Sequence, residues 1–239
     1  MRASRPKIIS MTDKAYTRLL MSIVTIEFPP GERLSLNDLM ARFKIGRTPL
    51  REALIKLESL GLVEMHRRKS ILVSNITLQG VKSFFEIYQA LERLVSRLAA
   101  ERAGAEEVMR LKRANAQMRS SFDKKDFYEM TKWNIDFHQT IAEASRNAYL
   151  ISIMKFVYLN SQRLSYISYS AHNQELNHEL YSQDIVKILE QHTEIISFIE
   201  NRQYAELEQK VGEHVRTFQS RLFKYLQGSD SYESTGSFG

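Results

Sequence analysis

The stretch from Gly46 to Gly61, GRTPLREALIKLESLG, most constrains how this chain of 239 residues can fold. Its apolar residues recur at spacings of three and four, which predicts an amphipathic helix with one buried stripe. These residues are Leu50, Ala53, Leu54, Leu57 and Leu60. Arg47, Thr48 and Arg51 lie off the stripe in the first turn, where backbone N–H groups without partners and the helix dipole attract phosphate. The stretch therefore predicts a helix that packs on a core and reads DNA with its N-terminal end.

The segments on either side of this helix complete a DNA-binding motif. Ser35 to Phe43 has the spacing of a short helix, and Lys44 to Gly46 is a tight connection, so the two helices predict a helix-turn-helix. Downstream, Leu62 to Met65 and Ile71 to Ser74 are short β-prone runs around the basic segment from His66 to Lys69. These runs predict a wing hairpin.

The distribution of charge supports a division of the chain near Ile76. Residues 1–76 contain 14 Lys and Arg against 7 Asp and Glu, a net charge of +7, and the remainder has 20 against 21, a net charge of −1. A basic part joined to a near-neutral part indicates that the first part binds a polyanion. The absence of cysteine excludes disulfides and thiolate metal sites. No window approaches the roughly 18 to 20 apolar residues of a membrane span, so we expect a cytoplasmic protein without membrane contact.

The chain after Ile76 is predicted to be helical throughout, beginning with Thr77 as the N-cap of a long helix. About six amphipathic helices joined by short turns favour an antiparallel bundle. Their expected bounds are 78–103, 105–122, 126–144, 147–168, 179–200 and 203–226, after a first helix of the N-terminal part over 13–27. The predicted fold class is mainly α. It comprises a winged helix-turn-helix over 1–76, a helical effector-binding and dimerisation domain over 77–227 and a disordered tail over 228–239.

Four polar residues of the helical domain are spaced so that they can converge. Asn134 and His138 lie four apart, which places both side chains on one helix face, as a pair of metal ligands requires. His192 and His214 lie on either side of the turn near Asn201, so a hairpin of the last two helices brings them to a similar level. By pattern alone, the set fits either a divalent-metal site or separate hydrogen-bonded structural histidines.

The segment FPPGERLSLNDLMARFKIGRTPLREALIKLESLGLVEM contains the elements PG-x-x-L, RTP-x-REAL and L-x-x-x-GLV. With them, residues from about Lys14 to Thr77 resemble the winged helix-turn-helix of GntR-family bacterial transcription regulators. Gly46 stands where that family usually has a capping Ser or Thr. The resemblance implies contacts to DNA bases and phosphates from Arg47, Thr48 and Arg51, from Arg68 and Lys69 at the wing tip, and at Asn37, where a basic residue is common.

The sequences LERLVSRLAAERA, FHQTIAEASRN and HTEIISFIE, with the later HVRTF, resemble the ligand-binding bundle of the FadR subfamily, the FCD type, over nearly all of residues 78–226. The resemblance implies a divalent metal ion such as zinc or nickel. The ligands it implies are Asn134, His138, His192 and His214. Asn134 stands where Asp is commoner and supplies a neutral oxygen instead of a carboxylate.

The same resemblance implies a small effector, a carboxylate that chelates the metal ion. Gln89 stands where many members of the subfamily have an Arg, and Arg163 is a second source of contacts from another helix. For Arg163, an ordinary exposed surface charge is the alternative interpretation. These two residues are the candidate effector contacts.

Three functions are compatible with these patterns. The leading hypothesis is a transcription regulator, not an enzyme, that binds a palindromic double-stranded DNA operator as a homodimer, acts as a repressor and responds to its effector. The second is a metal-dependent hydrolase with Asp136 or Glu143 as the base, in which the basic N-terminal part has no role. The third is a non-specific DNA-binding protein whose bundle only dimerises.

Overall fold

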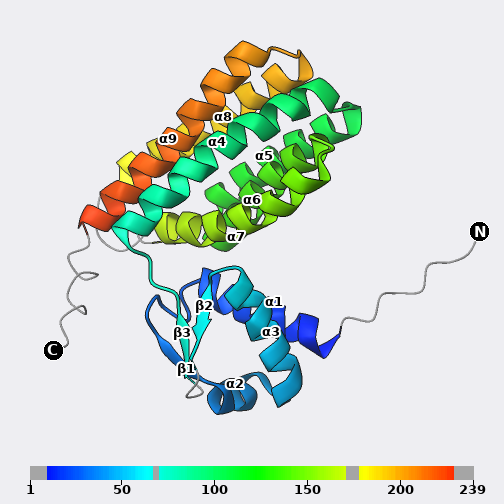
Figure 1. Ribbon diagram of the computed structural model, residues 1–239. Coiled ribbons are helices and arrows are strands. Elements are labelled where there is room, and N and C mark those ends of the chain that lie inside the picture. The colour runs from blue at the N-terminus through cyan, green and yellow to red at the C-terminus, as the bar shows by residue number, and fades with distance from the viewer. Residues whose placement is uncertain (1–9, 67–69, 171–177, 229–239) are drawn as a thin grey trace, which may run out of the picture. The chain divides into compact units, whose positions relative to one another are not determined.

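The computed structural model describes residues 10–66, 70–170 and 178–228 (Figure 1). The chain divides into two compact units, Met1–Ile76 and Thr77–Gly239. Helices dominate both units, which confirms the predicted fold class. The wing-tip residues Arg68 and Lys69, and the predicted tail except Gly228, lie outside the described residues.

The described part of the first unit contains three helices and a three-stranded antiparallel sheet. Its elements are α1 (Met11–Val24), β1 (Arg33–Ser35), α2 (Leu36–Phe43), α3 (Arg47–Ser59), β2 (Val63–Met65) and β3 (Ser70–Val73). β3 lies between β1 and β2. Leu50, Leu54 and Leu57 of α3 are fully buried in one apolar cluster with α1 and the sheet. The stripe predicted for α3 is therefore the centre of this core.

Helix α1 is shifted toward the N-terminus relative to the predicted range 13–27. It begins at Met11 because Ser10 caps it, with the Ser10 hydroxyl accepting from the Asp13 N–H at 3.0 Å. It ends at Val24, before the prolines, because Ile26 takes a left-handed φ of 61°. The Phe28 N–H then donates to the Ser22 carbonyl at 2.9 Å, which closes the helix end.

Strand β1 was not predicted from the sequence. It has three residues, too few to show a two-residue alternation. Its pairing partner is β3, with Arg33 opposite Leu72, so the strand exists through a contact between residues far apart in the chain. The wing is therefore a three-stranded sheet instead of a simple hairpin.

The described part of the second unit contains the six predicted helices. They are α4 (Leu78–Arg102), α5 (Ala105–Asp123), α6 (Phe127–Ala144), α7 (Ala148–Ser170), α8 (His178–Glu200) and α9 (Tyr204–Gly228). The predicted cap of α4 is confirmed, because the Thr77 hydroxyl accepts from the Gly80 N–H at 3.0 Å. No helix within the described ranges combines the length and the apolar character needed to cross a bilayer.

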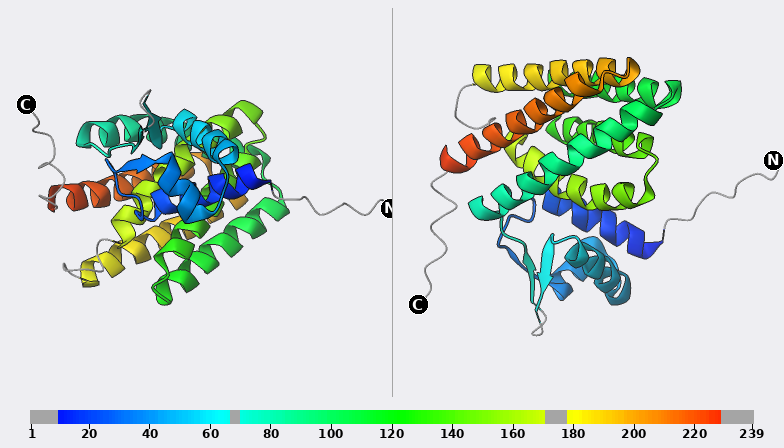
Figure 2. Two further views of the ribbon diagram at one scale, coloured as in Figure 1. Left: turned by 90° about the horizontal axis from the view of Figure 1, so that it is seen from below. Right: turned by 45° about the horizontal axis from the view of Figure 1, so that its top comes forward.

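The helices of the second unit do not pack simply in chain order. α4 packs mainly against α9, the last helix, and also contacts α6, α7 and α8. α4 and α9 run side by side in the views of Figures 1 and 2. α5 packs on α6 and α8, and α8 packs on α9. Side chains from α4, α6, α7, α8 and α9 can therefore meet in one interior region.

Candidate nucleic-acid interface and metal centre

The turn before α3 sets the direction of that helix. Lys44 ends α2 in the left-handed conformation with φ of 54°, and the next residue, Ile45, is buried and anchors the turn. Gly46 precedes α3 and provides no side-chain cap. Pro49, in the first turn of α3, has no N–H group. The backbone N–H groups of this turn that can donate to an anion are therefore those near Arg47.

A groove of about 380 Å³ lies between α2, the start of α3 and the wing strands. Asn37, Arg47 and Arg51 line it, so three residues predicted to contact DNA meet on one surface. Thr48 is exposed but does not line the groove. His66 also lines the groove, and sequence reasoning missed it. Its position directly before the wing tip was the available signal.

The arginines of the first unit fall into two kinds. Arg18 donates to the main-chain carbonyl at the end of α2 at 2.9 Å, and Arg42 forms an ion pair with Glu27. Arg47 and Arg51 are exposed, and within residues 10–66, 70–170 and 178–228 neither forms an ion pair. Their charges are therefore directed to solvent at the groove.

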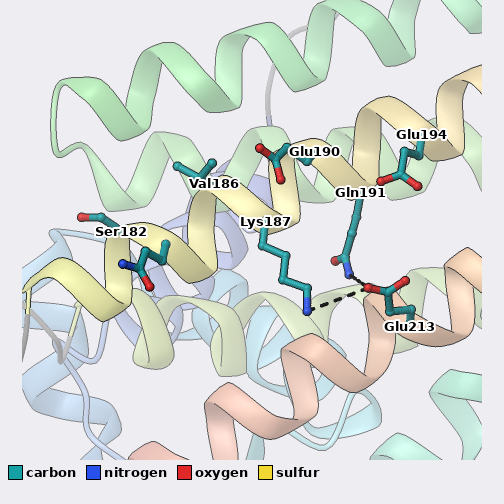
Figure 3. A pocket seen from close by; sticks show the side chains of 8 residues that line it. Ser182, Val186, Lys187, Glu190, Gln191, Glu194 and Glu213 are labelled. Carbon is teal, nitrogen blue, oxygen red and sulfur yellow. Dashed lines mark hydrogen bonds and ion pairs between the residues drawn. The ribbon is translucent and has the colours of Figure 1, made fainter.

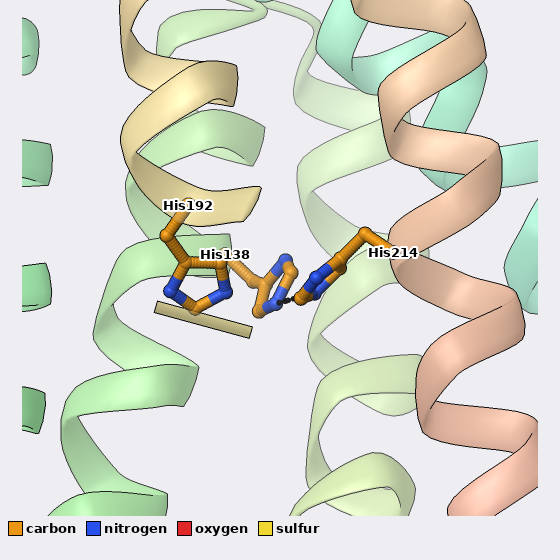
Figure 4. A group of neighbouring side chains, drawn as sticks. All are labelled: His138, His192 and His214. Atoms are coloured by element: carbon orange, nitrogen blue, oxygen red, sulfur yellow. Dashed lines mark hydrogen bonds between the residues drawn. The ribbon is translucent and has the colours of Figure 1, made fainter. Parts of the chain in front are cut away.

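The three histidines predicted as metal ligands meet inside the second unit (Figure 4). His138 comes from α6, His192 from α8 and His214 from α9, and one ring nitrogen of each lies within 4.8 Å of the others. All three rings are buried. Asn134, one turn before His138, is 7% exposed and lines a small cavity with His138 and His214. The structure thus brings the predicted residues into one region.

Hydrogen bonds fix the orientation of His138. Its Nδ1 lies 2.6 Å from Oε1 of Glu92, a buried residue of α4. Tyr158 of α7 donates its hydroxyl to the other oxygen of Glu92 at 3.0 Å. Burial raises the pKa of Tyr158 well above its usual range, so this hydroxyl keeps its proton. Glu92 accepts from both neighbours, and Nε2 is the ring nitrogen of His138 that remains to face His214.

The ring of His214 is oriented in a similar way. Its Nδ1 lies 3.2 Å from Oε1 of Gln191, and its Nε2 lies 3.4 Å from Nε2 of His138. Burial, with the neighbouring His138 and Arg221, lowers the pKa of His214 well below its usual range, so the ring is neutral. With both Nδ1 atoms bonded to their own partners, the two Nε2 atoms are the ring nitrogens left to share a cation.

His192 supplies a second argument for a cation. Its ring is fully buried and stacks on Phe137, with ring centroids 4.0 Å apart and planes inclined by 11°. Neither ring nitrogen has a hydrogen-bond partner among the described residues. A buried polar atom without a partner costs roughly 1 to 3 kcal/mol. Three converging imidazoles with a nearby amide oxygen therefore fit a divalent metal ion.

The cavity beside the histidines has a volume of about 10 Å³, roughly enough for one water molecule. Arg221 lines it, is 2% exposed and donates from Nε to the hydroxyl of Ser168 at 3.1 Å. Gln89 and Arg163, the candidate effector contacts, do not line it. Arg163 is 4% exposed, so the interpretation of this residue as a surface charge is wrong.

Sequence reasoning missed Glu92, Gln191 and Arg221 in this region. Two of them had a local signal. Glu92 belongs to the Leu–Glu pair of the motif in α4, and Gln191 directly precedes His192. Nothing in the sequence distinguishes Arg221 from an ordinary charge near the end of α9.

The bases considered for a hydrolase do not reach the histidines. Glu143 is exposed and forms an ion pair with Arg110 at 2.8 Å. Asp136 is half-buried and does not line the cavity. The enzymatic alternative therefore has no base at the metal centre among the residues proposed for it.

A winged helix-turn-helix with a basic groove, followed by a separate helical bundle, is the architecture of a DNA-binding regulator. Residues 11–73 match the gntR family of bacterial regulatory proteins, and residues 83–217 match the FCD domain. The chain belongs to the GntR family of bacterial transcription regulators with an FCD domain. The chain is a transcription regulator and not an enzyme.

Similar proteins cover almost the whole chain. The HTH-type transcriptional repressor RspR of Escherichia coli (strain K12) is 23% identical over 224 residues, 94% of either chain. The Nta operon transcriptional regulator of Aminobacter aminovorans is 26% identical over 207 residues, 86% of this chain and 91% of that protein. The solved structure of E. coli McbR/YncC gives a TM-score of 0.78 at 18% identity and covers 92% of this chain and 100% of that one. This last similarity shows a shared fold.

Proposed function

We propose that this chain binds a palindromic DNA operator as a homodimer and represses transcription from it. The observation that carries the proposal is the groove that Asn37, Arg47 and Arg51 line together. Neither arginine forms an ion pair with another described residue, so both charges are available to DNA. An Arg on a helix that enters the major groove reads guanine with two hydrogen bonds. Thr48 and the wing residues Arg68 and Lys69 complete the proposed contacts. A regulator of bacterial DNA acts in the cytoplasm.

A homodimer fits the surface of the second unit. Ile87 and Leu94 of α4 are 59% and 46% exposed and lie seven residues apart, so they share one face of the helix. Exposed apolar residues on one face are typical of association surfaces. A two-fold symmetric dimer presents two copies of α3 to the two halves of a palindrome.

The second unit is proposed to hold a divalent metal ion, zinc or nickel, through His138, His192, His214 and Asn134. The support is the unpartnered ring of His192 and the facing Nε2 atoms of His138 and His214. When bound, the ion would act as a Lewis acid that accepts an oxygen of a small carboxylate effector. Glu92 and Gln191 orient the imidazoles of His138 and His214.

The effector is proposed to be a small carboxylate placed beside the metal ion, with Arg221 as a buried cation that lines the cavity. A carboxylate is larger than a cavity of about 10 Å³, so its binding requires the cavity wall to move. α4 and α7 form part of that wall through Tyr88, Ser161 and Ser165. The same two helices carry Gln89 and Arg163, which therefore remain candidate contacts in an enlarged cavity. If the effector binds two arrangements of the dimer with unequal affinity, its binding would change the affinity of the dimer for DNA.

The DNA-binding proposal is tested by selecting duplexes from a random library with the purified full chain. A palindromic consensus is expected. Arg51→Ala should then weaken binding to the selected duplex by about 1 to 3 kcal/mol, because a bidentate contact to guanine is lost. Arg216→Ala, an exposed Arg of α9, is the matched control and should not change the affinity. Failure to enrich any sequence would instead support non-specific binding.

The effector proposal is tested by a thermal-shift screen of small carboxylates on the metal-loaded and chelator-treated chain. A compound that raises Tm only in the loaded protein supports binding at the metal centre. A compound that acts equally on both forms shows binding that does not involve the metal. That result would contradict this placement of the effector.

A further inference from the structure

We infer that Gln191 is a positioning residue for the metal centre, and that Glu213 and Thr217 hold its amide in the orientation that prepares His214 for metal binding. The inference rests on the proposed metal centre. It concerns residues that touch no metal ion themselves. Gln191 directly precedes His192 on α8, and Glu213 directly precedes His214 on α9. Each of the two helices thus supplies one histidine and one part of the support.

The first step is the orientation of the amide of Gln191. Its Nε2 donates to Oε1 of Glu213 at 3.2 Å and to the hydroxyl oxygen of Thr217 at 3.1 Å. Glu213 forms an ion pair with Lys210, whose Nζ lies 2.8 Å from Oε2, and a carboxylate in such a pair can only accept. The Thr217 hydroxyl donates its proton to the main-chain carbonyl of Glu213 at 3.0 Å. Both neighbours therefore need a donor, and only the NH₂ end of the amide can face them.

The second step is the tautomer of His214. With its NH₂ held by Glu213 and Thr217, Gln191 presents its oxygen to Nδ1 of His214 at 3.2 Å. An oxygen acceptor requires the proton on Nδ1, so the lone pair of the neutral ring is on Nε2. That atom is the one directed at His138, 3.4 Å away. Rotation of the amide by half a turn would favour the other tautomer, in which Nε2 carries a proton and cannot bind a metal ion.

The two oriented histidines have supports of different kinds. His138 is held by Glu92, a carboxylate that is 1% exposed. His214 is held by a neutral amide that is 2% exposed and leads outward to Glu213, whose side chain is 38% exposed. Figure 3 shows Gln191 reaching from α8 to Glu213 at the edge of a surface groove. The outer part of this support can therefore be changed without opening the core.

The experiment uses the full chain with ¹⁵N-labelled histidine and Co²⁺ as the probe. Long-range ¹H–¹⁵N spectra of the metal-free protein identify the protonated nitrogen of each ring, and competition with a chelator gives the Co²⁺ affinity. The test variant is Glu213→Leu combined with Thr217→Val, which removes both acceptors. The matched control is Glu190→Leu, the same change at an exposed residue that lines the same groove (Figure 3).

We expect His214 to be protonated on Nδ1 in the unchanged protein and in the control. In the test variant, the form protonated on Nε2 should become populated, and the Co²⁺ affinity should fall roughly 10- to 100-fold, as is typical when support for a ligand is lost. The exchange variant, Gln191→Glu with Glu213→Gln, keeps an acceptor at position 191 facing His214 and places a donor at position 213 facing residue 191. This variant should retain the Nδ1 form of His214 and the Co²⁺ affinity.

Two results would overturn the inference. One is a His214 that is protonated on Nε2 in the unchanged metal-free protein. The other is a test variant whose tautomer and Co²⁺ affinity match those of the control. If the unchanged protein binds no Co²⁺ while the tautomer responds as expected, the proposed metal centre fails and the orientation of His214 by Gln191 stands. The tautomer measurement therefore separates the two proposals.

Discussion

The two units of this chain place polar groups in opposite positions. In the described part of the first unit, Ser22 is the one buried polar side chain, and the core is otherwise apolar. Its candidate DNA contacts, Arg47 and Arg51, are on the surface. The second unit buries Glu92, His138 and other polar residues among its helices. In the first unit, the residues that form the core are therefore different from the candidate DNA contacts. The second unit instead has its candidate site inside its core.

This difference follows from the ligands that each unit is proposed to bind. DNA is larger than the domain and can only be met at a surface, where phosphate contacts need exposed cations. A metal ion is small and is held best by several fixed donors from which water is excluded. Buried polar groups of this kind cost free energy unless each has a partner. Changes in the two units should therefore have separable consequences.

The largest expected effect is on metal content. His138→Ala removes a ring that has Glu92 on one side and His214 on the other, and it should abolish the stoichiometric metal that we expect in the unchanged chain. Binding to the selected duplex should persist, because the groove proposed to bind DNA lies in the first unit. Elemental analysis of chelator-free protein measures the metal, with His66→Ala as a control at an exposed histidine. Equal metal in His138→Ala and in the unchanged chain would remove this residue from the centre.

The next effect is on stability of the first unit. Leu54 is 0% exposed in the core, so Leu54→Ala should lower the free energy of unfolding by about 2 to 5 kcal/mol. Ile55→Ala, at a residue 53% exposed, should change it by less than about 0.5 kcal/mol. Trp133 is the single Trp and lies in α6, so its fluorescence follows the second unit during denaturation. A Trp133 transition that shifts together with circular dichroism would show that the units unfold as one.

The smallest effect is expected at an exposed ion pair of the bundle. Arg110 of α5 and Glu143 of α6 lie 2.8 Å apart, with side chains 41% and 50% exposed. Solvent screens such a pair, so Arg110→Ala should cost about 0 to 1 kcal/mol. Denaturation followed by Trp133 fluorescence measures the change. In about 1 M salt the difference should vanish, and a loss that persists there would mean that the Arg110 side chain stabilises the bundle by packing.

Local spacing predicted much of the fold. The stripe around Leu54 identified the buried face of α3, and the hydroxyl of Thr77 identified the start of α4. Asn134 and His138 are spaced i, i+4, and His192 and His214 lie on either side of the turn between α8 and α9. These two spacings correctly predicted that the candidate ligands lie near one another. These predictions succeeded because a helix fixes which residues share a face over a few turns.

Other features required contacts between residues far apart in the chain. β1 is too short to recognise and is defined by its pairing with β3. Gln89 was selected by its place in a motif, but Tyr88 is the residue that lines the cavity. Two neighbouring positions on a helix are about 100° apart, so an uncertainty of one residue decides between facing the cavity and facing away from it.

The sequence by itself determined the two units, the class of regulator, the helix that carries Arg47 and Arg51, and the three histidines that cluster. Only the tertiary structure decided that Glu92 orients His138, that Gln191 faces His214, and that Arg163 is buried. The physical reason is that amphipathic spacing specifies which face of each helix is buried. It does not specify the partner that this face meets, which depends on how the helices of the second unit pack against one another.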